Sequence, residues 1–186
     1  MSVIVAIKDN DRIVVGCDTR LSSNKLYFDD YNLCPKAFHI NENTIVACAG
    51  STCLANIVGS YIKDMDVISR DSIVLELLPK ISEKLRGTPY LDNDYLDGEL
   101  MIAHKDKCYV VASNYNVLDV QDYGAIGSGV VSALSSLYTT ESLGYSPEAR
   151  ILIAIEVTGK LISSVSQEVY MSDTKGDKFK KKIIKK

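Results

Sequence analysis

The order of apolar segments predicts an α+β protein with a four-layer αββα sandwich, in which two mainly antiparallel sheets lie between pairs of helices. Three observations support this fold class. Strand-like runs come in pairs across short polar turns, which is typical of antiparallel hairpins and not of βαβ units. Several runs are apolar without alternation, so both of their faces need cover. Helical patterns follow the second and third hairpins, and two stacked sheets with helices outside them satisfy this order.

The first half of the chain is predicted to form two hairpins and then two helices. The four expected strands are residues 2–7, 13–17, 36–40 and 44–49. Apolar residues at helical spacing then predict a helix over residues 54–62. A second stripe predicts a helix from residue 72 to about residue 86, which Pro79 should kink or end. The polar segment 87–98 is expected to be an exposed loop.

The second half repeats the scheme of hairpin and helices. Residues 100–103 and 109–112 are expected to pair as strands, and a helix is expected over residues 130–137. Another helix should begin at Ser146, because a capping serine, a proline at the first helical position and an acid in the first turn follow one another there. A last strand is expected over residues 167–171.

Length and charge predict one domain over residues 1–174 and a basic, flexible C-terminal tail over residues 175–186. The chain has 186 residues, 46% of them hydrophobic, which suits a single domain with a sizeable core. The tail has seven lysines against one aspartate, a net +6, so the overall −3 leaves −9 for the body. A nucleic-acid-binding domain places basic charge on a folded face, so we expect no nucleic-acid partner.

Cysteine usage and the N-terminal residues predict a cytoplasmic protein. The five cysteines include no C-x-x-C pair, and no signal peptide is visible at the start of the chain. Two uncharged stretches, residues 44–62 and 123–140, are long enough to suggest membrane spans. Each has Gly, Ser, Thr or Asn at its centre, so strand, turn and helix explain it better, and we expect no membrane association.

The usual catalytic motifs are absent from the sequence, but the N-terminus offers a nucleophile. The chain has two histidines, His39 and His104, which we expect to be structural or surface residues, and no Walker or G-x-S-x-G motif. Removal of Met1 would leave Ser2 with its hydroxyl beside a free α-amine, whose ordinary pKa of about 7.7–8.0 suits a general base. Such a residue needs no histidine. Taken alone, however, Met-Ser is an ordinary chain start.

Several blocks of sequence together resemble the proteasome β-subunit family of N-terminal-nucleophile (Ntn) hydrolases, and most of all its bacterial HslV-type peptidases. These blocks are SVIVA at residues 2–6, IVVGCDTR at 13–20, PKAF at 35–38, ACAGS at 47–51, AIGSG at 125–129 and AIEVTG at 154–159. They follow the family's order along most of the chain. The resemblance implies the Ntn-hydrolase fold and a peptidase that works through an acyl-enzyme.

The resemblance also implies roles for individual residues. Ser2 would be the nucleophile in place of the family's usual threonine, and Asp18 would orient its amine and hold Lys36. The Lys36 charge would lower the pKa of the amine and of the hydroxyl. The Gly50 amide would bind the oxyanion, and Ser128 would hydrogen-bond the amine of Ser2. Taken singly, each also has an ordinary structural explanation: a turn-capping Asp, an exposed strand Lys, a turn glycine and a helix N-cap.

The resemblance implies polypeptide substrates, a homo-oligomeric ring and an ATP-dependent unfoldase as partner. No cofactor is expected, although the family allows a structural monovalent cation on carbonyl oxygens near Gly159. The interval from Asp18 to Lys36 is two residues longer than the family's, which predicts an insertion around residues 23–32. Two alternatives therefore stay open: an inactive ring-forming paralogue that keeps Met1, and a hydrolase of small amides on the same fold.

Overall fold

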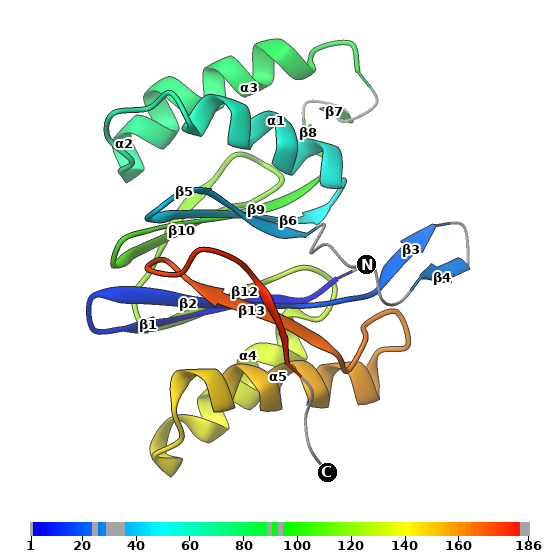
Figure 1. The fold of residues 1–186 in the computed structure, drawn as a ribbon. Helices are drawn as coiled ribbons and strands as arrows, with labels where there is room; N and C mark the ends of the chain where they lie inside the picture. Colours follow the sequence, from blue (N-terminus) through cyan, green and yellow to red (C-terminus); the bar gives the residue numbers. More distant parts are fainter. Residues whose placement is uncertain (1, 24–25, 29–35, 89–90, 93–94, 183–186) are drawn as a thin grey trace.

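A computed structural model of the chain shows four layers, and the predicted fold class is confirmed (Figure 1). The structure describes all residues except 1, 24–25, 29–35, 89–90, 93–94 and 183–186. Helices α1–α3 cover one sheet, helices α4 and α5 cover the other, and the two sheets face each other in the middle. None of the helices in the described part of the chain is long and apolar enough to cross a membrane.

The first sheet has the strand order β12-β1-β2-β13-β14, and every neighbouring pair is antiparallel. Its strands are β1 (Ile4–Asp9), β2 (Arg12–Asp18), β12 (Tyr123–Ile126), β13 (Val169–Asp173) and β14 (Lys180–Lys182). The β1–β2 hairpin runs the length of the sandwich, with its turn at one end. The start of β1 and the end of β2 therefore lie together at the other end, and we call this the N-terminal end of the sandwich.

The second sheet has the order β11-β10-β9-β6-β5, again antiparallel throughout. Its strands are β5 (Ala37–Asn41), β6 (Thr44–Gly50), β9 (Gly98–His104), β10 (Lys107–Val111) and β11 (Val117–Val120). Along β6 and β9, alternate side chains point to opposite faces. One set packs under the helices, and the other meets the first sheet, where small residues such as Ala47 and Ala103 let the two sheets approach. This is why these strands are apolar on both faces.

The helices over the second sheet confirm the predicted pair and explain the effect of Pro79. Helix α1 spans Thr52–Ile62. The second helical segment consists of α2 (Arg70–Ser72), a π-helical turn (Ile73–Leu77) and α3 (Leu78–Leu85), so it continues through the proline. Proline lacks the N–H that an interior helical position donates. The wider π turn lies directly before Pro79, which occupies the first turn of α3, where that N–H is not needed.

The helices under the first sheet begin where local sequence predicts. Helix α4 spans Val130–Thr140 and leads through a short 3-10 turn (Glu141–Leu143) to α5 (Pro147–Leu161). The Ser146 hydroxyl caps α5 by accepting a hydrogen bond from the Ala149 N–H at 3.2 Å. The N-cap, the proline and the acid of this helix therefore act as the sequence predicts.

The structure adds short strands that the sequence did not predict, and it corrects the flexible tail. Strands β11 and β12 extend the two sheets, and β7 (Leu91–Asp92) and β8 (Tyr95–Leu96) form a small hairpin within the expected exposed loop. Strands β3 (Leu21–Ser23) and β4 (Leu26–Phe28) form another, which begins just before the expected insertion and extends into it. Residues 180–182 of the predicted tail are strand β14, because β13 offers them an edge and Glu168 pairs with Lys181 at 3.0 Å.

Candidate active site

Ser2 lies at the N-terminal end of the sandwich, where the chain enters β1. It is only 6% exposed. The peptide group that joins Ser2 to Val3 is held on one side by Asp18, whose Oδ1 accepts the Val3 N–H at 2.9 Å. The Asp18 N–H in turn donates to the Val3 carbonyl at 3.2 Å. The end of β2 therefore fixes the first residues of the chain.

Asp18 and Lys36 form a buried ion pair beside Ser2. Lys36 Nζ donates to Asp18 Oδ1 at 2.6 Å, and the two side chains are 2% and 0% exposed. Asp18 Oδ2 accepts the N–H groups of Arg20 at 3.1 Å and Ser166 at 3.2 Å. Buried charges are tolerated only when they are paired and hydrogen-bonded, and four donors meet this requirement for the carboxylate. The structure thus brings together Ser2, Asp18 and Lys36, which are far apart in sequence.

The strand ladder positions Lys36 and directs the amide of Gly50. The Lys36 carbonyl accepts the Cys48 N–H at 2.8 Å on the β5 side of β6, while the Ser51 N–H donates to Asp97 at 3.1 Å on the β9 side. N–H groups alternate along a strand, so the Gly50 N–H points to the same side as that of Cys48. Gly50 has φ 134°, and a Cβ there would lie 2.5 Å from the Asp97 carbonyl oxygen. Only glycine suits this position.

The turn before α4 closes the other side of Ser2. The Ser2 carbonyl accepts long hydrogen bonds from the Gly129 N–H at 3.3 Å and the Ser128 hydroxyl at 3.4 Å. Gly127 has φ 96°, and a Cβ there would lie 2.3 Å from the Ser2 carbonyl oxygen, so a side chain would displace Ser2. Ser128 therefore contacts Ser2 through the carbonyl, and its role toward the amine stays a prediction. Gly129, and not Ser128, is the N-cap of α4.

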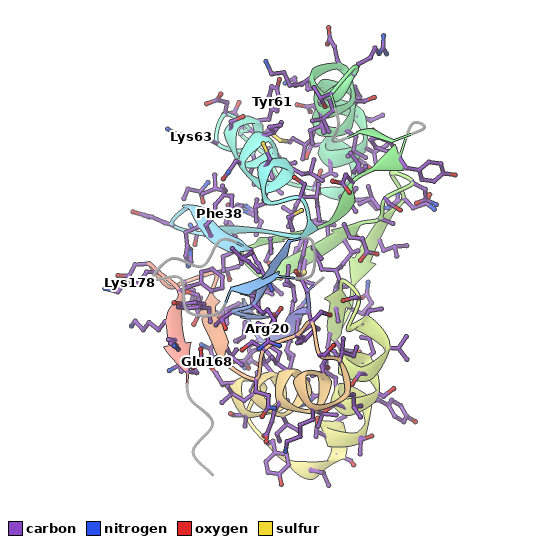
Figure 2. The ribbon with its side chains drawn as sticks, turned by 90° about the vertical axis from the view of Figure 1, so that its right-hand side faces the viewer. Arg20, Phe38, Tyr61, Lys63, Glu168 and Lys178 are labelled. Atoms are coloured by element: carbon purple, nitrogen blue, oxygen red, sulfur yellow. The ribbon has the colours of Figure 1, made fainter. Side chains whose placement is uncertain are left out.

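Two further residues belong to this cluster although sequence reasoning did not find them. The Ser166 amide binds Asp18, and the Glu99 carboxylate accepts the Gly127 N–H at 2.8 Å. Neither contact leaves a signature in the sequence, since each joins a side chain to a distant backbone amide. Arg20 also lies at this end, where it appears near the centre of Figure 2, and its guanidinium donates to the Ser163 carbonyl.

Cys48 and the two histidines are poorly placed or poorly activated as an alternative nucleophile or base. Burial raises the pKa of the Cys48 thiol to about 12, so it stays protonated at neutral pH. His39 bonds to Ser172 at 2.8 Å and His104 to Thr44 at 2.9 Å, and burial lowers the pKa of both imidazoles. The described residues include no group of three His, Cys, Asp or Glu side chains that could hold a metal ion.

Two stacked antiparallel sheets between layers of helices are the architecture of the Ntn-hydrolase fold, and a buried Asp–Lys pair lies beside Ser2 in it. The comparison with family models gives the narrower assignment: the family described as Proteasome subunit matches residues 2–175. The chain therefore belongs to the proteasome subunit family.

Solved structures share this fold at low sequence identity. Two structures of Thiobacillus denitrificans BPH, one of them in complex with epoxomicin, match with a TM-score of 0.78 and 18% identity. Each match covers 92% of this chain, and 97% of BPH in the complex or 96% in the other structure. HslV from Trypanosoma brucei matches with a TM-score of 0.69 and 16% identity over 92% of this chain and 98% of its own. No curated protein sequence matches this chain.

Proposed function

We propose that this protein is a peptidase of the proteasome and HslV type, with Ser2 as its nucleophile after removal of Met1. The observation that carries this proposal is the buried Asp18–Lys36 pair, at 2.6 Å, next to a serine that is the second residue of the chain. A buried cation contributes little net stability, because its removal from water costs several kcal/mol and offsets most of what the ion pair gains. Its place beside a nucleophile that has its own amine gives the charge a chemical use.

In the proposed reaction the free α-amine of Ser2 takes the hydroxyl proton as Oγ attacks a peptide carbonyl. The oxyanion that forms is stabilised by the Gly50 N–H. The amine then gives its proton to the leaving amino group, the C–N bond breaks, and an ester to Ser2 remains. Water attacks this ester while the amine again accepts a proton; the ester C–O bond then breaks, the amine returns that proton to Ser2 Oγ, and the second product leaves as a carboxylic acid that ionises in water. Each proton is returned, so no cofactor is needed.

Lys36 and Asp18 support this cycle without touching the scissile bond. The Lys36 charge disfavours protonation of the nearby α-amine and so keeps it uncharged, and able to accept the hydroxyl proton, near neutral pH. Asp18 holds Lys36 with one oxygen and also holds the Val3 N–H with it, so the cation and the nucleophile share one anchor. The pair is also shielded from salt, since screening acts weakly on buried charges.

The test is intact mass spectrometry of the purified protein before and after reaction with an electrophilic peptide probe. We expect the mass to lack Met1, one probe to be added per chain, and peptide mapping to place it on Ser2. The Ser2→Ala variant should add no probe, and Cys53→Ser is the matched control, which should be labelled like the wild type. A preparation that cleaves peptides while every chain retains Met1 would refute the mechanism.

Members of the proteasome and HslV family form rings and generally work with unfoldases, and we extend both properties to this chain as proposals. A homo-oligomeric ring should appear as one large assembly in native mass spectrometry, whereas a stable monomer would contradict it. If only short amides are cleaved, the small-amide hydrolase is the better description. A ring that retains Met1 and binds no probe would be the inactive paralogue.

A further inference from the structure

Glu99 lies at the end of the layer between the two sheets, where it is partly buried. It is the second residue of β9 and pairs with Ala49 across β6. Met101 and Ala103, two and four residues later, belong to the core between the sheets, so Glu99 shares their face. A carboxylate there gives up part of its hydration, so it gains from a hydrogen-bond partner. Among the described residues, no Lys, Arg or His forms an ion pair with it.

The carboxylate is instead used to hold a backbone amide of the opposite sheet. Its Oε2 accepts the Gly127 N–H at 2.8 Å, and Gly127 directly follows β12. A hydrogen bond to an ionised acceptor is roughly twice as strong as one between neutral groups. It is also much shorter than the bonds of 3.3 and 3.4 Å from the same turn to Ser2. Glu99 therefore anchors this turn to the second sheet.

The same turn contacts Ser2, so Glu99 acts on the position of Ser2 through it. The Val130 N–H donates to the Gly127 carbonyl at 3.0 Å, and the Ala133 N–H donates to Gly129 at 3.0 Å, so the turn is built into the start of α4. Gly129 and Ser128 then hold the carbonyl of the Ser2–Val3 peptide group, whose N–H Asp18 holds from the other side. Because a peptide group is planar, fixing both of its sides fixes its orientation. The amine and hydroxyl of Ser2 keep only the rotations about their own single bonds.

We infer that Glu99 is a positioning residue of the proposed reaction, which orients the Ser2–Val3 peptide group through the turn 127–129. Asp18 and Glu99 thus clamp one peptide plane from the two sheets, the first directly and the second through Gly127. This inference rests on the proposed function of Ser2. It adds a residue that contacts neither the substrate nor the reacting atoms and acts by setting the direction in which the nucleophile points.

The test compares Glu99→Ala and Glu99→Gln in the processed, full-length protein. Loss of the acceptor in Glu99→Ala should lower kcat about ten- to a hundredfold with KM unchanged, because misplacement of a reacting group by about 1 Å costs up to about 10²-fold. Glu99→Gln keeps a carbonyl oxygen as acceptor and should restore kcat to within about threefold of the wild type. A wild-type kcat in Glu99→Ala, an effect on KM alone, or a Gln variant as slow as the Ala variant would each overturn the inference.

Glu148→Ala is the matched control, because the Glu148 carboxylate also joins two segments, through Arg12 at 2.8 Å, but at the opposite end of β2. It should lower stability and leave kcat unchanged. A second readout does not depend on turnover: in Glu99→Ala the amides of Gly127 and Gly129 should exchange with solvent faster, and unchanged exchange would overturn the inference. A wild-type protein that never labels at Ser2 would instead refute the proposed function.

Discussion

At the N-terminal end of the sandwich, Asp18 and Lys36 are paired almost out of contact with water, whereas at the opposite end Arg12 gathers three carboxylates at the surface. Arg12 contacts Asp9 at 2.7 Å and Glu148 and Asp173 at 2.8 Å each, and its side chain is 28% exposed. The second cluster joins the β1–β2 hairpin to α5 and β13, so it has a structural purpose. Apolar side chains of similar size would stabilise the fold as well as the Asp18–Lys36 pair does, so stability alone does not explain this pair beside Ser2.

Under the proposed function, the buried pair serves the reaction of Ser2, whereas the surface cluster holds elements of the fold together. Each ion pair of a surface network contributes little to stability, and salt weakens it further by screening. Substitution of one member of a buried pair is strongly destabilising, because it leaves an uncompensated charge in the interior. The two ends should therefore respond differently to substitution, to salt and to pH.

The largest effect is expected from Lys36→Met, which leaves the Asp18 carboxylate buried and unpaired. Stability should fall by about 3–5 kcal/mol, and probe labelling at Ser2 should slow at least about 10²-fold, since the amine loses the charge that keeps it unprotonated. Urea unfolding measures the change in stability, and the rate of probe addition measures the change in labelling at Ser2. Adding Asp18→Asn should recover part of the stability but none of the labelling. Labelling at the wild-type rate in Lys36→Met would contradict the role of the pair.

A smaller effect is expected from Arg12→Gln at the opposite end. Loss of the partner of three carboxylates should lower the free energy of unfolding by about 1–2 kcal/mol, discounted for partial exposure. In 1 M salt, where the Debye length is about 3 Å, the difference from the wild type should shrink. Labelling of Ser2 in the folded protein should be unchanged. A slower labelling rate would show that the two ends are coupled, contrary to the comparison.

The smallest effect is expected from His39→Gln, which tests a pH-dependent contact between the two sheets. The Ser172 hydroxyl donates to the Lys178 carbonyl at 3.0 Å, so His39 Nε2 must donate to Ser172. The buried Nδ1 then has no proton and, among the described residues, no partner. Burial lowers the pKa of His39 in the folded state, although Asp173 and Asp177 oppose the shift.

Because the folded pKa lies below the unfolded value of about 6.5, the unfolded state binds the proton more readily. The stability that neutral His39 provides is fully present above about pH 6.5 and is lost as the pH falls through the folded pKa. Unfolding free energies of the wild type should thus decline more steeply between pH 7 and pH 5 than those of His39→Gln, by at most about 1.4 kcal/mol per pH unit. Parallel curves would contradict this assignment.

The layers of the fold could be predicted from the sequence because they depend on local patterns. Ser146 and Pro147 start α5 by capping chemistry that lies within four residues. Strands β11 and β12 were missed, since Val117–Val120 is short and Tyr123–Ile126 merges with the uncharged run before α4. The strand at residues 180–182 was missed as well, because three consecutive lysines form a strand only where a partner edge is available.

Apart from Ser2, which its place after Met1 suggested, the residues of the candidate site came from the resemblance and not from any local pattern. Asp18 and Lys36 are 18 residues apart, and only the folded sheets bring their side chains to 2.6 Å. Glu99 could not have been found in this way, since its partner is a backbone amide 28 residues away. The resemblance also placed Ser128 beside Ser2, but the atom that it contacts is the carbonyl oxygen.

The most direct test of the central claim compares two forms of the same chain that differ only at the N-terminus. One form is released from a cleavable fusion with Ser2 as its first residue, and the other keeps Met1 with a blocked amine. If the amine of Ser2 is the base, the first form should add one electrophilic peptide probe per chain at Ser2 and cleave peptides, and the blocked form should do neither. Equal labelling or equal cleavage by the two forms would contradict the account.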